Sequence, residues 1–142
     1  MPRLLGLDVG ERRLGVAVSD PDGVLASPVA VVERRGTLLD FRAIADLAEA
    51  HEVARIIVGL PISLNGSIGP QAQRVLAFIE ELRPLTPVPI ETWDERYTSV
   101  AAEDLLRQAG LSPAKRRQRI DSAAAAVLLQ DYLDSHHAKA PP

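Results

Sequence analysis

Three strand-like segments precede the first helical segment of this chain, and this order restricts the possible folds more than any other feature. The first two segments, 3–9 and 13–19, are joined by the short connection 10–12, so they are expected to form a hairpin. A turn at 20–23 leads to a third extended segment, 24–32. The sequence therefore predicts a three-stranded antiparallel unit at the start of the chain.

Helical and strand-like segments alternate after the third strand. Thr37 is a suitable N-cap for a helix with Phe41 and Ile44 on its apolar stripe, and 55–60 is β-branched and apolar on both faces, as a central parallel strand is. The remaining expected elements are a helix after Pro70, a strand at 88–93, and helices through 102–109 and 120–128. This order predicts an α/β domain at 1–135 and a tail at 136–142.

Length and composition fit one small domain. The chain has 142 residues, 46% of them hydrophobic, which suffices for a layered core. No apolar stretch reaches the length of a membrane span, and residues 1–3 lead directly into the first strand without a signal-peptide pattern. We therefore expect a soluble cytoplasmic protein. The absence of cysteine excludes disulfides, thiolate zinc sites and a cysteine nucleophile.

One carboxylate interrupts the first apolar strand. Asp8 shares a strand face with Gly6 and Gly10, and a buried carboxylate is costly unless a positive group meets it. The two glycines could leave room for a hydrated metal ion or a phosphate. Alternatively, they could allow a helix to pack closely while Asp8 caps a turn.

Four motifs along the chain give a more specific expectation. They are 7–20, 58–61, 94–99 and 121–125. In order and spacing these motifs resemble the YqgF family, also called RuvX-like, across residues 3–134. The resemblance implies a ribonuclease H-like fold with a mixed five-stranded sheet, three antiparallel strands followed by parallel strands, flanked by helices.

The same resemblance implies a nuclease that uses divalent metal, with Asp8, Glu95 and Asp121 at the family's acidic positions. Members are described as processing the precursor of 16S ribosomal RNA, here expected at its 5′ end, and as resolving Holliday junctions. Two Mg²⁺ or Mn²⁺ ions, about 4 Å apart, can activate a water and neutralise the leaving oxygen of a phosphodiester. Three carboxylates are enough to hold such a pair. Asp121 could instead complement the dipole in the first turn of the last helix, and Asp94 could cap a turn beside Glu95.

Basic residues flank the acidic positions, and fourteen of the sixteen lysine and arginine residues are arginine. We expect Arg12 and Arg96 to contact substrate phosphates, although each could pair with a nearby acid. A basic run just before Asp121 could bind the nucleic-acid backbone or could be an ordinary solvated face; it consists of Lys115, Arg116, Arg117 and Arg119.

Three classes of function remain open. The first is an endonuclease acting on structured RNA or branched DNA, with ribosomal RNA maturation ahead of Holliday junction resolution in recombination and repair. The second is a nucleotide phosphotransferase, and the third is a catalytically silent nucleic-acid-binding domain. The sequence is compatible with a monomer or a homodimer, whereas resolving a two-fold symmetric junction requires a dimer.

Overall fold

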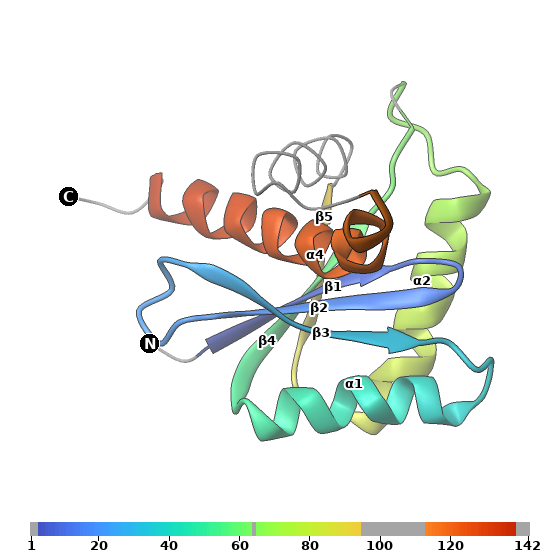
Figure 1. The fold of residues 1–142 in the computed structure, drawn as a ribbon, viewed down its shortest axis with the longest axis horizontal. Coiled ribbons are helices and arrows are strands. Elements are labelled where there is room, and N and C mark those ends of the chain that lie inside the picture. Colours follow the sequence, from blue (N-terminus) through green and yellow to red (C-terminus); the bar gives the residue numbers. More distant parts are fainter. Residues whose placement is uncertain (1–2, 64, 95–112, 139–142) are drawn as a thin grey trace.

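The structure is a computed structural model that describes residues 3–63, 65–94 and 113–138; in the last helix it describes the side chains of 123–136. A five-stranded sheet forms the centre, with its strands in the order β3-β2-β1-β4-β5 (Figure 1). The strand bounds are Arg3–Val9 for β1, Arg13–Ser19 for β2, Ala26–Glu33 for β3, Val53–Leu60 for β4 and Ile90–Asp94 for β5. The helix expected through 102–109 lies outside the described residues.

The strand directions confirm the predicted mixed sheet. β1 pairs with β2, and β2 with β3, in antiparallel orientation. β4 is parallel to β1, and β5 is parallel to β4. The short connection between β1 and β2 fixes the hairpin register, which places Leu7 opposite Val16 and Asp8 opposite Gly15. The central strand β1 therefore has paired neighbours on both sides.

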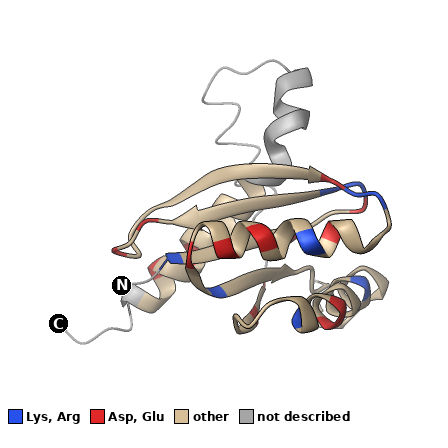
Figure 2. Cartoon of the chain, turned by 90° about the horizontal axis from the view of Figure 1, so that it is seen from below, with Lys and Arg blue, Asp and Glu red and all other residues tan. Residues whose placement is uncertain are grey.

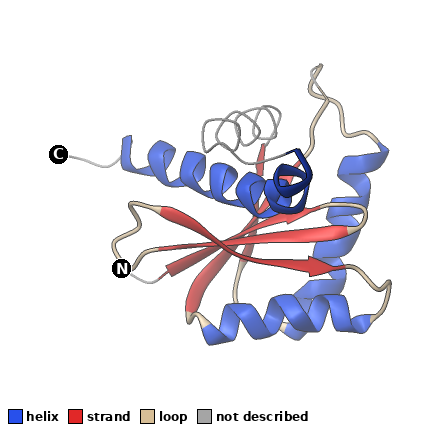
Figure 3. Ribbon diagram, viewed as in Figure 1, coloured by secondary structure: helices blue, strands red, loops and turns tan. Residues whose placement is uncertain are grey.

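Helices α1 and α2 cover one face of the sheet (Figure 3). α1 spans Leu38–Ala50 and begins as predicted at Thr37, whose side chain accepts a hydrogen bond from the Leu39 amide at 3.2 Å. α2 spans Pro70–Leu82 and is followed by the 3-10 turn η1, Arg83–Leu85. The core between these helices and the sheet consists of fully buried aliphatic side chains, among them Leu5, Leu7, Val16, Ile44, Ile56 and Ile79.

Helix α4, Pro113–Ala138, crosses the other face of the sheet. Its side chains Ala125, Leu128 and Leu129 are fully buried against Ala17 and Ile57. Of the helices that the structure describes, none combines the length and apolar character needed to span a bilayer. Each face of the sheet is thus covered by helix, as a sheet with two apolar faces requires.

The bounds of α4 differ from the sequence-based expectation at both ends. The sequence predicts Asp121 in the first turn of the last helix, but it is the ninth residue counted from Pro113. That prediction is wrong because the basic run 115–119 is itself helical. The expected tail at 136–142 begins inside the helix, and the His136 ring stacks on Tyr132 with ring centres 3.9 Å apart. Residues 139–142 lie outside the described part.

Candidate functional site

The candidate site is built around Asp8 in the central strand β1. Leu5 and Leu7 pack toward α1 and α2, whereas Leu4 and Gly6 face α4. Because side chains alternate along a strand, Asp8 lies on the face that α4 crosses. Asp8 is partly exposed. Its carboxylate is therefore held by a rigid central strand and is still reached by solvent.

The glycine before Asp8 allows close helix packing. A Cβ at Gly6 would lie 2.8 Å from the Leu129 Cβ and 2.9 Å from the Ala125 carbonyl oxygen. Both atoms belong to α4, so the helix could not approach β1 this closely if position 6 carried a side chain. The expectation that Gly6 leaves room for an ion or a phosphate is wrong, and the alternative of close helix packing is confirmed.

The glycine after Asp8 is required by the hairpin turn. The Gly10 amide donates a hydrogen bond to the Arg13 carbonyl oxygen at 3.0 Å. A Cβ at Gly10 would approach that same oxygen to 2.6 Å. The space beside Gly10 is therefore filled by the turn itself, and the expectation of an open cradle is wrong here too.

Bare backbone does flank Asp8, but on the neighbouring strands rather than along β1. Gly15 of β2 lies directly opposite Asp8. On β4, Gly59 follows Val58, the register partner of Leu7, and Gly59 in turn pairs with Trp93 of β5. Directly paired residues in an antiparallel sheet have Cβ atoms about 5 Å apart, so a side chain at position 15 would stand next to the Asp8 carboxylate. Sequence reasoning missed these two glycines, although the hairpin register could have identified Gly15.

Of the three predicted acidic residues, Asp8 is the one whose backbone and side chain both lie in the described part of the chain. Glu95 lies outside the described residues, as does Arg96, and the side chains of Asp121 and of the basic run 115–119 are also outside them. Among the described residues, no group of three or more histidine, cysteine, aspartate or glutamate side chains is arranged to hold a metal ion. The described range 65–94 ends at the partly exposed Asp94, which pairs with Leu60 at the carboxyl end of β4.

Arg12 lies exposed in the turn between β1 and β2. The neighbouring acid, Glu11, forms an ion pair with Arg74 of α2 at 3.3 Å, and both side chains are largely exposed. Such an exposed pair contributes little stability, roughly 0–1 kcal/mol. Glu11, one acid that could have paired with Arg12, thus has Arg74 as a partner.

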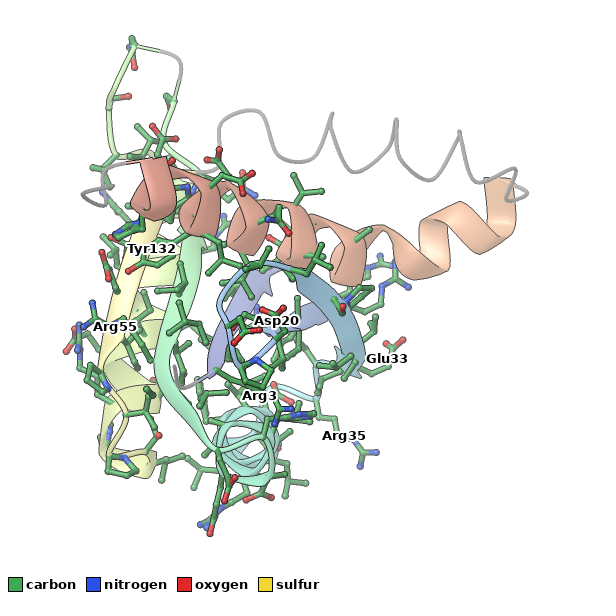
Figure 4. The ribbon with its side chains drawn as sticks, turned by 90° about the vertical axis from the view of Figure 1, so that its left-hand side faces the viewer. Arg3, Asp20, Glu33, Arg35, Arg55 and Tyr132 are labelled. Atoms are coloured by element: carbon green, nitrogen blue, oxygen red, sulfur yellow. The ribbon has the colours of Figure 1, made fainter. Side chains whose placement is uncertain are left out.

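A polar network fixes α4 over the parallel half of the sheet. Glu91 of β5 accepts hydrogen bonds from Arg55 of β4 at 2.8 Å and from the Tyr132 hydroxyl of α4 at 3.0 Å. Figure 4 shows Arg55 and Tyr132 on the same side of the molecule. Trp93 donates to Asp131 at 2.8 Å, and its ring meets Tyr132 edge-on. These bonds set the position of α4 relative to the central strand.

The network also makes stability depend on pH. Burial alone raises the pKa of Glu91, but the hydrogen bonds from Arg55 and Tyr132 outweigh it and leave the pKa below its ordinary value of 4.5. Burial, reinforced by Glu91, raises the pKa of the Tyr132 hydroxyl. A lowered carboxylate pKa stabilises the folded state above the unfolded pKa, and this contribution is lost as the pH falls through the folded pKa.

Glu91→Gln is therefore expected to lower stability at neutral pH by about 1 kcal/mol, a value discounted because the side chain is 37% exposed. The difference from wild type should shrink as the pH falls below 4.5, the ordinary value for this carboxyl. Urea unfolding of both proteins between about pH 6 and about pH 3 measures this difference in the free energy of unfolding. A difference that stays constant over this range would show that the Glu91 charge does not stabilise α4.

The mixed sheet, with an aspartate in its central strand, defines a ribonuclease H-like α/β protein. Two solved structures share this fold: Thermus thermophilus RuvC in complex with a Holliday junction substrate, and the fowlpox virus resolvase with Holliday junction DNA. RuvC matches with a TM-score of 0.62 and 16% identity, covering 100% of this chain and 99% of that chain. The viral resolvase matches with a TM-score of 0.61 and 13% identity, covering 94% and 98%. At such identities the likeness shows the fold alone.

Sequence comparison identifies the family. The RuvX family model, described as Holliday junction resolvase, matches residues 2–135, and the chain belongs to this family. A protein of Desulforamulus reducens named "Putative pre-16S rRNA nuclease" is 47% identical, over 94% of this chain and 97% of that protein. A protein of Thermoanaerobacter pseudethanolicus with the same name is 44% identical, over 96% and 99%. The resemblance inferred from the four motifs is confirmed.

Proposed function

We propose that this protein is a metal-dependent endonuclease that hydrolyses phosphodiester bonds during 5′-end maturation of pre-16S ribosomal RNA. The observation that carries the proposal is the partly exposed Asp8 on the central strand, with glycines beside it on both neighbouring strands. The names of relatives that are 44–47% identical over nearly the whole chain support the substrate. A role in ribosomal RNA processing would place the protein in the cytoplasm.

Asp8, Glu95 and Asp121 would hold the metal. Carboxylate oxygens are the ligands that Mg²⁺ and Mn²⁺ prefer, and Gly15 and Gly59 add no side chain beside Asp8 at their positions on the two paired strands. When bound, two such ions supply an activated water and neutralise charge on the leaving oxygen. The protein's part is to keep the three carboxylates ionised and fixed in direction.

The positions of Glu95 and Asp121 in the chain support this proposal. Glu95 directly follows Asp94, and in β5 the odd-numbered Glu91 and Trp93 face α4, as Asp8 does. Position 121 precedes Ala125 by one helical turn, and Ala125 contacts β1 at Gly6, two residues before Asp8. The described elements nearest to the two acids, β5 and α4, therefore both lie on or beside the sheet face that carries Asp8.

The start of α4 weakens the purely structural explanation of Asp121. A carboxylate stabilises a helix through the dipole only within the first turn, by about 0.3–1 kcal/mol. Eight helical residues precede Asp121 in α4, so this contribution is negligible there. A role in holding metal accounts for a carboxylate at this position better than helix capping does.

Arg12, Arg96 and the basic run 115–119 would contact the nucleic-acid backbone. Clustered carboxylates repel phosphates, so nearby positive charge is needed to bring the strand to them. The net charge of −3 makes a local basic surface necessary for this. Contact with phosphates positions a substrate without reading its sequence, which suits recognition of a folded RNA by its shape.

Holliday junction resolution is the second candidate function. The observation in its favour is the shared fold with two resolvases solved with junction DNA, together with the description of the family model. A resolvase must present two active sites to a two-fold symmetric junction, so it would act as a homodimer. Trimming of RNA requires one site and is possible for a monomer. The phosphotransferase and the silent binding domain are weaker hypotheses, because the family is one of nucleases.

A direct assay separates these functions. Purified protein is incubated with a pre-16S fragment carrying the 5′ extension, or with a synthetic four-way junction, in Mg²⁺, Mn²⁺ or EDTA. We expect metal-dependent cleavage of the RNA. Paired symmetric nicks in the junction by a dimer, without RNA cleavage, would favour the resolvase. Binding of either nucleic acid without cleavage in any metal would leave only the silent binding domain.

A further inference from the structure

Arg34 lies at the corner between β3 and α1 and reaches the turn that follows Asp8. Its Nη1 donates a hydrogen bond to the Gly10 carbonyl oxygen at 2.8 Å. Its backbone amide donates to the Arg12 carbonyl oxygen, also at 2.8 Å. Both acceptors belong to the β1–β2 turn, so one residue binds this turn at two points.

The hydrophobic core holds the Arg34 side chain in place. Its guanidinium carbon lies 5.3 Å from the centre of the Phe78 ring, which itself packs on Phe41 at 4.6 Å. A guanidinium can lie over an aromatic ring and donate a hydrogen bond in its own plane at the same time, which an ammonium group cannot do as well. The side chain is therefore anchored in the α1–α2 layer and directed at the turn.

The backbone around Arg34 is anchored as well. The buried carboxylate of Asp40, 3% exposed, accepts hydrogen bonds from the amides of Arg35 at 2.9 Å and Gly36 at 3.0 Å. These bonds fix the two residues that follow Arg34. The β3–α1 corner is thus a rigid support beside the β1–β2 turn, and Figure 2 shows basic positions gathered where the two lie side by side.

We propose that Arg34 is a positioning residue, which holds the β1–β2 turn so that Arg12 keeps a fixed place relative to Asp8. Arg34 acts through Gly10 and Arg12 and does not itself touch the substrate. The effect on cleavage rests on the proposed nuclease function, whereas the effect on the turn does not. Without the Arg34 side chain the turn keeps its backbone hydrogen bonds but loses the bond to the Gly10 carbonyl, so it moves more, and phosphate bound by Arg12 would be less well aligned with the carboxylate.

Amide hydrogen exchange by NMR tests the contact with the turn. In Arg34→Lys and Arg34→Gln we expect the Gly10 amide, bonded to the Arg13 carbonyl, to exchange about tenfold faster, since a hydrogen bond from a charged donor is lost. The Ile57 amide in β4 should exchange at the wild-type rate, which shows that the effect is local. Arg35→Lys is the matched control, because Figure 4 shows that side chain pointing away from the molecule. Unchanged Gly10 exchange in both Arg34 variants would overturn the proposal.

Single-turnover cleavage tests the consequence for the reaction. Arg34→Lys keeps the positive charge, so we expect the cleavage rate at saturating protein to fall about tenfold while the substrate Kd changes less than about threefold. Arg35→Lys should cleave at the wild-type rate. A weakened Kd with an unchanged rate would overturn the proposal, because Arg34 would then be a substrate contact. Faster Gly10 exchange with normal cleavage would overturn it too.

Absence of cleavage by the wild-type protein would instead refute the proposed function, and the exchange rates would still decide whether Arg34 holds the turn.

Discussion

Asp8→Asn is expected to abolish phosphodiester cleavage and to leave a folded protein. The amide has nearly the shape of the carboxylate but lacks the negative charge that a divalent cation requires. We expect the single-turnover rate on the pre-16S fragment to fall by about a thousandfold, which corresponds to roughly 4 kcal/mol of transition-state stabilisation. Glu95→Gln and Asp121→Asn should behave in the same way, because each would remove one ligand.

A matched control separates this effect from a general change in charge. Asp46→Asn alters an exposed aspartate of α1, on the opposite face of the sheet, and should cleave at the wild-type rate. Cleavage by Asp8→Asn within about tenfold of wild type would remove Asp8 from the proposed site. Loss of cleavage together with a large loss of stability would show that Asp8 has a structural role.

Gly6→Ala is expected to destabilise the fold strongly, although it adds only one methyl group. The new Cβ would lie 2.8 Å from the Leu129 Cβ and 2.9 Å from a carbonyl oxygen of α4. These atoms belong to the helix close to its backbone, so only a movement of α4 or β1 can relieve the clash. We expect a loss of about 2–3 kcal/mol, and a fall in Tm of roughly 8 °C, measured by thermal unfolding.

The matched control for this substitution is Gly69→Ala. A Cβ at position 69 would have Ser63 Oγ as its nearest neighbour, at an ordinary contact distance of 3.6 Å. Because Gly69 is the N-cap of α2, we expect a small loss of less than about 1 kcal/mol. If Gly6→Ala melts at the wild-type temperature, the close contact between α4 and β1 is not required for the fold.

Local signals predict most of the fold. The short connection 10–12 fixes the hairpin register, and Thr37 and Pro70 mark the starts of α1 and α2. These features act between neighbours in the chain, so the sequence displays them. The start of α4 is also visible in principle, since Ser112 followed by Pro113 is a typical helix start.

The surroundings of Asp8 could not be predicted in the same way. Gly6 and Gly10 lie on the same strand face as Asp8, which suggests that they make space for a ligand. Their contacts with Leu129 and Arg13 show instead that they allow close packing and a tight turn. The glycines that do flank the carboxylate, Gly15 and Gly59, belong to other strands. The hairpin register can identify Gly15, but Gly59 lies beside Asp8 through the pairing of β1 with β4, two strands that are far apart in the sequence.

Thermal unfolding with and without metal tests most directly whether Asp8 belongs to a metal site. If Asp8, Glu95 and Asp121 converge, Mn²⁺ or Mg²⁺ at about 100 times its Kd should stabilise the wild-type protein by about 2.7 kcal/mol. For a chain of this length the Tm should rise by roughly 8 °C. Asp8→Asn should melt at or above the wild-type temperature without metal, because repulsion among the carboxylates is relieved, and should gain little from metal. A wild-type protein that shows no shift at millimolar metal, with Asp8→Asn clearly less stable, would contradict the metal-dependent mechanism.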